Sequence, residues 1–83
     1  MDQIARTPKQ IGAIIQRRRR QLQETQSGLG ARIKHRQATI SRIEAGEPGT
    51  TLATLLDVLS ALKLELVVRP RTKGSPEDIE AMF

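Results

Sequence analysis

Two short helical patterns separated by only three residues constrain this fold more than any other feature of the chain. They cover residues 26–33 and about 37–45, and each has apolar residues three or four positions apart, such as Ile40 and Ile43 in the second. Residues 34–36 form the whole link between them. Because the apolar residues mark one buried face, the polar residues of the second helix point outward, and further helices are needed to cover the apolar side.

A capping signal predicts a helix before this pair. Thr7 offers a capping hydroxyl, Pro8 suits the first helical position, and Gln10 follows three residues after the cap. Thr25 is the expected cap of the helix at 26–33. The inner stripe of the first helix is expected to consist of Ile11, Ile14, Ile15 and Leu22.

A leucine-rich segment predicts a helix after the pair. Gly46 supplies the left-handed residue that commonly ends a helix, and Thr50 or Thr51 is placed to cap the next one. Leucines then recur at helical spacing and should form the centre of the core: Leu52, Leu55, Leu56, Leu59 and Leu62.

The pattern changes from helix to strand at residues 64–69. Apolar and polar positions alternate there until Pro70 ends the run, and a lone strand has no partner within this chain. We expect it to pair with the same strand of a second copy as an antiparallel ribbon, through Leu64, Leu66, Val67 and Val68. Residues 1–71 are then one domain, and residues 72–83 are a flexible acidic tail with a short helix beginning near Ser75.

The composition narrows the possible functions. A chain of 83 residues makes one small domain that gains from a second copy. It has no Cys and one His, so we expect no disulfide, metal site or cofactor. It has no apolar run long enough to span a membrane and no secretory signal, so we expect a cytoplasmic protein without membrane contact.

Charge is distributed unevenly along the chain. Residues 1–43 contain ten Lys or Arg and two acidic residues, whereas residues 44–83 contain four and seven. This asymmetry is typical of a polyanion-binding face, although a solvated basic surface would give the same charge pattern.

The helix pair and its surroundings resemble a known family. Two short helices joined by three residues are the parts of a helix-turn-helix, and the stretch TQSGLGARIKHRQATISRIEAG resembles the DNA-binding motif of the Cro and phage-repressor class. This resemblance covers roughly residues 8–63. The run TTLATLLDVLSALKLEL leads from a helix into a strand without a break and is most similar to HipB-type antitoxins.

The resemblance implies both a fold and a function. The expected fold is all-α, a lambda-repressor-like bundle of four to five helices with a helix-turn-helix, plus one short C-terminal strand that pairs across a homodimer. The expected function is sequence-specific repression at an inverted-repeat operator in double-stranded DNA, together with restraint of a HipA-like serine/threonine kinase toxin encoded in the same operon.

The alternatives are a phage-type repressor without a toxin and an interaction adaptor that binds no DNA. No nucleophile-and-base set or phosphate loop is visible in the sequence, so we do not expect an enzyme.

The outer face of the second helix of the pair holds side chains that suit base recognition. Gln offers a donor and an acceptor that match an adenine edge, Arg is the commonest partner of guanine, and Ala can lie against a thymine methyl. The resemblance places the base-reading residues at Arg36, Gln37, Ala38, Ser41 and Arg42, with a phosphate as the alternative partner of Arg36. An adaptor would not need these groups together on one exposed helix.

A second group of residues suits the phosphate backbone rather than the bases. Short polar side chains near helix starts, and cations around the turn, fix the docking position without choosing a sequence. The expected phosphate-binding residues are Thr25, Gln26, Arg32, Lys34, His35 and Thr39. Gln26 has two further interpretations, a simple helix-start residue and a brace to Gln37. His35 has no carboxylate or second ligand nearby in sequence, which favours a turn residue over a catalytic base.

The four arginines at 17–20 point in different directions on a helix and cannot share one role. The resemblance pairs Arg19 with Glu44 in a largely buried structural ion pair. The other three arginines are expected to form a solvated face, from which one of them could contact a phosphate.

Two positions near the turn depart from the family pattern. Lys34 stands where a glycine is usual, so we expect a positive φ at a residue with a side chain. Gly30 replaces an alanine, at a cost of up to about 1 kcal/mol in helix propensity.

The tail holds the last candidate site. Its apolar residues Ile79, Met82 and Phe83 are candidates for docking onto the toxin, with a solvated tail as the alternative.

Overall fold

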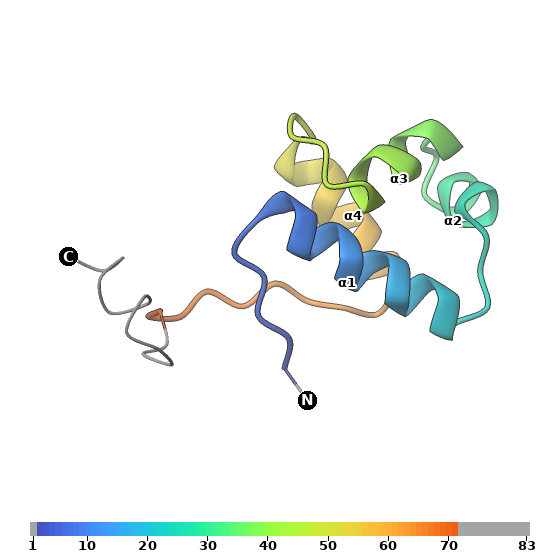
Figure 1. The fold of residues 1–83 in the computed structure, drawn as a ribbon. Coiled ribbons are helices and arrows are strands. Elements are labelled where there is room, and N and C mark those ends of the chain that lie inside the picture. The colour runs from blue at the N-terminus through green and yellow to red at the C-terminus, as the bar shows by residue number, and fades with distance from the viewer. Residues whose placement is uncertain (1, 72–83) are drawn as a thin grey trace.

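The structure, a computed structural model, describes residues 2–71 and contains four α-helices in that range (Figure 1). These are α1 (Pro8–Gln21), α2 (Gln26–Arg32), α3 (Gln37–Glu44) and α4 (Leu52–Ala61). The expected all-α class is confirmed, and the observed ends of α2 and α3 differ from expectation by one residue. None of these helices is long and apolar enough to cross a membrane. The expected helix near Ser75 and the tail residues Ile79, Met82 and Phe83 lie outside the described residues.

Threonine side chains begin three of these helices, as expected. The Oγ1 atoms of Thr7, Thr25 and Thr51 accept hydrogen bonds of 2.9 to 3.2 Å from the backbone N–H three residues later. Each bond satisfies a donor that a helix start otherwise leaves unpaired. Helix α3 begins after Arg36 without a side-chain cap.

The same hydrogen-bonded turn ends each helix of residues 2–71. One residue adopts a positive φ, and the next donates its backbone N–H to the carbonyl five residues earlier, as in the Schellman motif. Gly46 fills the positive-φ position after α3, but Gln23, Lys34 and Lys63 fill it after the other helices, at φ values of 57°, 60° and 58°. The positive φ expected at Lys34 is confirmed. Each of these three residues adopts a conformation that glycine would adopt at lower cost.

An apolar core holds the helices together. Every helix contributes to its buried side chains, which are Ile15, Leu29, Ile40, Ile43, Val58, Leu59 and Leu62. Burying each of these side chains stabilises the fold by roughly 1.5 to 3 kcal/mol.

Three leucines that were expected to be buried in the apolar stripes are exposed, so that prediction was wrong for them. Leu52 and Leu56 on α4 are 62% and 42% exposed, and Leu22 lies beyond the end of α1 and is 38% exposed. With about 100° between successive helical residues, Leu52 and Leu56 lie beside the stripe that contains Val58 and Leu62. Within residues 2–71 no other element covers that side of α4, so an apolar strip remains on the surface.

Two glycines let segments of the chain approach each other's backbone. A Cβ atom on Gly12 would overlap the carbonyl oxygen of Ile43, so the absence of a side chain allows α1 to pack on α3. A Cβ atom on Gly30 would lie 2.7 Å from the carbonyl oxygen of His35, closer than real Cβ contacts allow. The helix-propensity cost expected at Gly30 therefore has a structural reason, because an alanine would not fit beside the turn.

Two arginines hold the C-terminal end of α4. Arg18 Nε donates a hydrogen bond to the carbonyl of Leu62, and Arg32 Nη2 donates one to the carbonyl of Ala61, both at 2.9 Å. Cations are favourable there because the last carbonyls of a helix lack partners within it. Arg32 also forms a two-bond ion pair with Glu24, at 2.6 and 2.8 Å. The expectation that Arg18 belongs to a solvated face was wrong, since its guanidinium is partly buried against α4.

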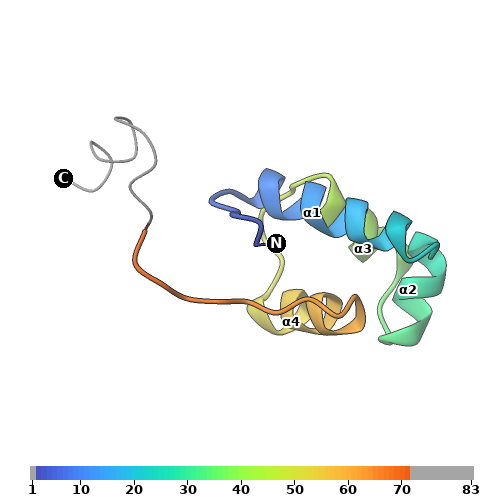
Figure 2. The same ribbon diagram turned by 90° about the horizontal axis from the view of Figure 1, so that it is seen from below.

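The chain leaves the helices after α4. Figure 2 shows this segment, drawn in orange, running along α4 and then away from the helices. Leu64 packs partly against the core, whereas Leu66, Val67 and Val68 are exposed, Val68 at 92%. Within residues 2–71 the segment has no neighbouring strand and forms none. Its pairing with a second copy stays a prediction.

Candidate nucleic-acid interface

The outer face of α3 is polar because the core takes up its apolar face. Ile40 and Ile43 are almost completely buried, which turns the other side of the helix to solvent. The residues expected to read bases therefore lie together on one face: Arg36, Gln37, Ala38 and Arg42 are exposed, and Ser41 is half-buried.

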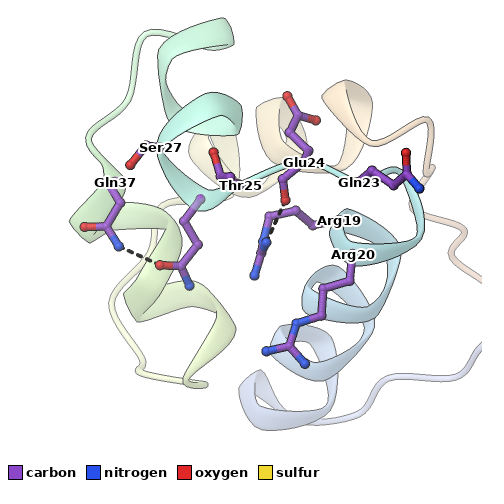
Figure 3. Close-up of a pocket in the computed structure, with 8 residues that line it drawn as sticks. Arg19, Arg20, Gln23, Glu24, Thr25, Ser27 and Gln37 are labelled. Atoms are coloured by element: carbon purple, nitrogen blue, oxygen red, sulfur yellow. Dashed lines mark hydrogen bonds between the residues drawn. The ribbon is translucent and has the colours of Figure 1, made fainter.

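A relay of hydrogen bonds links this face to the interior. Gln37 Nε2 donates to Gln26 Oε1 at 2.5 Å, the bond drawn as a dashed line from Gln37 in Figure 3. Gln26 Nε2 donates in turn to Glu44 Oε1 at 3.1 Å. Of the three roles predicted for Gln26, a phosphate contact, a helix-start residue and a brace to Gln37, the structure shows the brace. The brace fixes which edge of the Gln37 amide faces outward.

The inner end of the relay is an ion pair between Arg19 and Glu44, where the resemblance placed one. Two hydrogen bonds join the groups, from Nε to Oε2 at 2.6 Å and from Nη2 to Oε1 at 3.0 Å, and the Glu44 side chain is only 2% exposed. Arg19 Nη1 also donates to the carbonyl of Glu24 at 2.7 Å. The pair therefore ties α1 to both α3 and the start of α2.

Burial and hydrogen bonding act on Glu44 in opposite directions. Burial by itself raises the pKa of Glu44, but hydrogen bonds from Arg19, Gln26 and Gln16, together with the charge of Arg19, outweigh it. They hold the pKa of this carboxyl below its usual range. The hydrogen bond to Glu44 likewise raises the pKa of Arg19. Both groups stay charged at neutral pH.

The residues expected to contact phosphate fall into two groups in the structure, according to whether their side chains are bound to an acidic residue of the protein. Thr25 caps α2, Thr39 is half-buried on α3, and Lys34 is exposed in the turn. Arg32 and His35 instead have partners within the protein. Arg32 binds Glu24, and His35 Nε2 lies 3.4 Å from Asp57 Oδ2 on α4. Both side chains are therefore already engaged within the protein, although the Nη1 group of Arg32 takes no part in these bonds.

An open hollow of about 460 Å³ lies where the end of α1 meets the start of α2 (Figure 3). Its lining joins residues from three helices and one loop: Arg19, Arg20, Gln23, Glu24, Thr25, Gln26, Ser27 and Gln37. Sequence reasoning did not single out Gln16, Gln23 or Ser27. The four-residue spacing of Gln16 and Arg20 was the signal that could have placed these two on one side of α1. Gln23 lies beyond the end of that helix, so helical spacing does not apply to it.

Arg42 has an acidic neighbour at the other end of the α3 face. Its Nε atom lies 3.8 Å from Glu47 Oε2, and both side chains are mostly exposed. An exposed pair at this distance contributes little to stability, so it leaves Arg42 able to exchange Glu47 for another partner.

Comparison with known proteins agrees with this geometry. The helix-turn-helix family model matches residues 15–68. The chain is 35% identical over 74 residues to antitoxin HipB of Escherichia coli strain K12, spanning 89% of this chain and 84% of HipB. Two solved structures, a HipB-O4 20mer complex and a HipA-HipB-O2-O3 complex, each match with a TM-score of 0.79 and 32% identity over 86% of this chain and 100% of theirs. This chain is a member of the helix-turn-helix family and, within it, of the HipB group of antitoxins.

Proposed function

We propose that this protein is the DNA-binding antitoxin of a HipBA-like toxin–antitoxin module. A homodimer binds an inverted-repeat operator, represses the operon that encodes it, and restrains a HipA-like toxin. The observation that carries the DNA-binding part is the outer face of α3, where Gln37 is held by Gln26 while Ala38 and Arg42 remain exposed. Groups fixed in this way can match base edges in a major groove.

The known relatives support both parts of the proposal. The similar solved structures are complexes of HipB with a 20mer and of HipB with HipA. The likeness spans 100% of each of these solved chains at a TM-score of 0.79, which supports the same two kinds of partner for this protein. A regulator of this kind acts where genomic DNA lies, so we place it in the cytoplasm, and it needs no catalytic group of its own.

The surface supports a dimer. The uncovered strip of α4 and the C-terminal segment expose large apolar side chains, which are Leu52, Leu56, Leu66, Val67 and Val68. A second copy that covers them would let the segment at 64–69 pair as a strand and would hold two α3 helices for two half-sites about one helical turn apart.

The DNA-binding part is tested with the DNA upstream of the gene. Arg42→Ala should cost roughly 1 to 3 kcal/mol in affinity and relax the preference at one base position, because a bidentate contact with a base is lost. Lys34→Ala should weaken binding to upstream and random DNA about equally and reduce the slope of log affinity against log salt by up to about one. The measurement is fluorescence anisotropy on both duplexes.

Two results would contradict this division of roles. If both variants lose the same affinity on both duplexes, the assignment of Arg42 to bases is wrong. If the unaltered protein shows no preference for its upstream DNA, the adaptor interpretation replaces the repressor.

The toxin-binding part is tested by co-purification with the product of the neighbouring gene. The full chain should retain that protein. A version that ends at Arg71 should lose it if Ile79, Met82 and Phe83 form the docking site. If the full chain retains no neighbouring product, the antitoxin proposal fails and a phage-type repressor remains.

A further inference from the structure

The four consecutive arginines of α1 have separate environments. Arg19 is buried in the ion pair with Glu44, Arg18 binds the end of α4, and Arg17 Nη1 is hydrogen-bonded to Gln3 at 3.2 Å. Arg20 is exposed, as Arg17 is, but it differs from the other three in having no hydrogen-bond or ion-pair partner within residues 2–71.

Arg20 lies on the same side of the molecule as the base-reading face. It lines the hollow that also contains Gln26, Ser27 and Gln37, and Figure 3 shows Arg20 and Gln37 on opposite sides of that hollow. Gln16, four residues earlier on the same row of α1, hydrogen-bonds to Glu44 of α3. This row therefore faces α3, and Arg20 is its continuation toward α2.

The other charges around the hollow are already neutralised. The positive charge of Arg19 is compensated by Glu44, and the negative charge of Glu24 by Arg32. Arg20 therefore gives the hollow an uncompensated positive charge beside the polar residues of α2. A guanidinium in that situation suits an anion that two N–H groups can bind together, and a phosphate has that geometry.

We propose that Arg20 binds a backbone phosphate of the DNA next to the groove that α3 enters, and that Arg17 and Arg18 do not. This rests on the proposed DNA-binding function and identifies a contact within it. Arg20 positions the protein on the duplex and adds affinity without choosing a sequence.

The test compares matched variants within the same run. Binding of Arg20→Gln, Arg20→Lys and Arg17→Gln is measured by fluorescence anisotropy over a range of KCl concentrations, on the upstream duplex and on a random duplex of equal length. Arg20→Gln should reduce the salt slope by about 0.9 for each protomer on the DNA, equally on both duplexes, because one phosphate contact is lost. Arg20→Lys should keep most of the slope, and Arg17→Gln should leave it unchanged although it removes the same charge.

The outcomes distinguish this contact from the proposed function. An unchanged slope in Arg20→Gln overturns the contact alone. Equal losses in Arg17→Gln and Arg20→Gln also overturn it, since net charge would then explain both. Failure of the unaltered protein to bind either duplex overturns the contact together with DNA binding. Urea unfolding of Arg20→Gln should match the unaltered protein, which excludes a folding defect as the cause.

Discussion

Glu44 connects the interior of this protein to its proposed DNA-binding face. Its carboxylate accepts hydrogen bonds from Arg19 in the core and from Gln26 at the surface, and Gln26 accepts one from Gln37. A change at Glu44 therefore affects both folding and the orientation of a base-reading side chain. Loss of stability and loss of sequence preference should occur together in variants of this residue.

The first prediction concerns the pH dependence that Glu44 gives to stability. Its pKa in the folded protein lies below the ordinary value of 4.5, so the carboxylate stabilises the fold at every pH above 4.5. That contribution is lost as the pH falls from 4.5 through the lower folded-state pKa. Glu44→Gln should lose roughly 3 to 5 kcal/mol at neutral pH, because the buried Arg19 is left without its partner.

Urea unfolding at neutral pH and at several values below 4.5 measures this effect. The difference between Glu44→Gln and the unaltered protein should shrink as the pH falls, since the unaltered protein loses the contribution that the variant already lacks. Glu65→Gln, a change at an exposed carboxylate of the C-terminal segment, is the control and should have little effect on stability at neutral pH. A constant difference at all pH values would contradict the assignment to Glu44.

Single residues differ in how far the sequence could predict them. Arg19 and Glu44 were paired through the family resemblance, and Lys34 was expected to have a positive φ because it stands where the family usually has a glycine. The contact of Gln16 with Glu44 and the pairing of Arg32 with Glu24 were not predicted. Such contacts depend on the rotation of α1 and α2 about their axes, which spacing along the chain does not specify.

Helix packing is decided by backbone approach as much as by apolar side chains. Gly12→Ala should destabilise the protein by about 1 to 3 kcal/mol, because the added Cβ atom would overlap the backbone of α3 and push α1 away. Gly28→Ala is the control, since its Cβ atom would be close only to Thr25 Oγ1, at 3.0 Å, and Glu24 Cγ. Urea unfolding of both variants checks the difference. Equal stabilities would show that α1 and α3 can separate at little cost.

The positive-φ helix ends give a second prediction about elements. Lys63→Gly should stabilise the protein by up to about 1 kcal/mol, because glycine adopts the φ of 58° without the strain that a side chain causes. Lys63→Ala removes the same charge and keeps the strain, so it is the matched control. The free energy of unfolding in urea should rise only for the glycine variant. A similar rise for alanine would mean that charge, and not backbone strain, is responsible.

Helix starts were predictable because they depend on local chemistry. Thr7, Thr25 and Thr51 cap their helices in the structure as the sequence indicated. The buried face of α4 was not predictable in the same way. Helical spacing identified Leu52 and Leu56 as apolar positions, but burial depends on which neighbouring element lies there, and none of the described elements does.

The whole molecule is proposed to work as a dimer, and Val67 tests that proposal. Val67→Pro removes a backbone donor from the segment at 64–69 and should shift the protein toward monomer, because a strand within a ribbon needs that N–H group. Val67→Thr keeps the donor and a β-branched side chain, so it should remain dimeric. Sedimentation equilibrium measures both. A dimer that is unchanged by proline would place the contact elsewhere, such as on the exposed leucines of α4.

Arg18 and Arg32, which bind the C-terminal end of α4, also lie where a force on the C-terminal segment would enter the helices. The C-terminal segment begins directly after the carbonyls of Ala61 and Leu62, which Arg32 and Arg18 hold. A pull on that segment by a second copy or a toxin is therefore transmitted through these bonds to α2 and α1. The tether is therefore anchored to the two helices that hold α3 through Arg19 and Gln26.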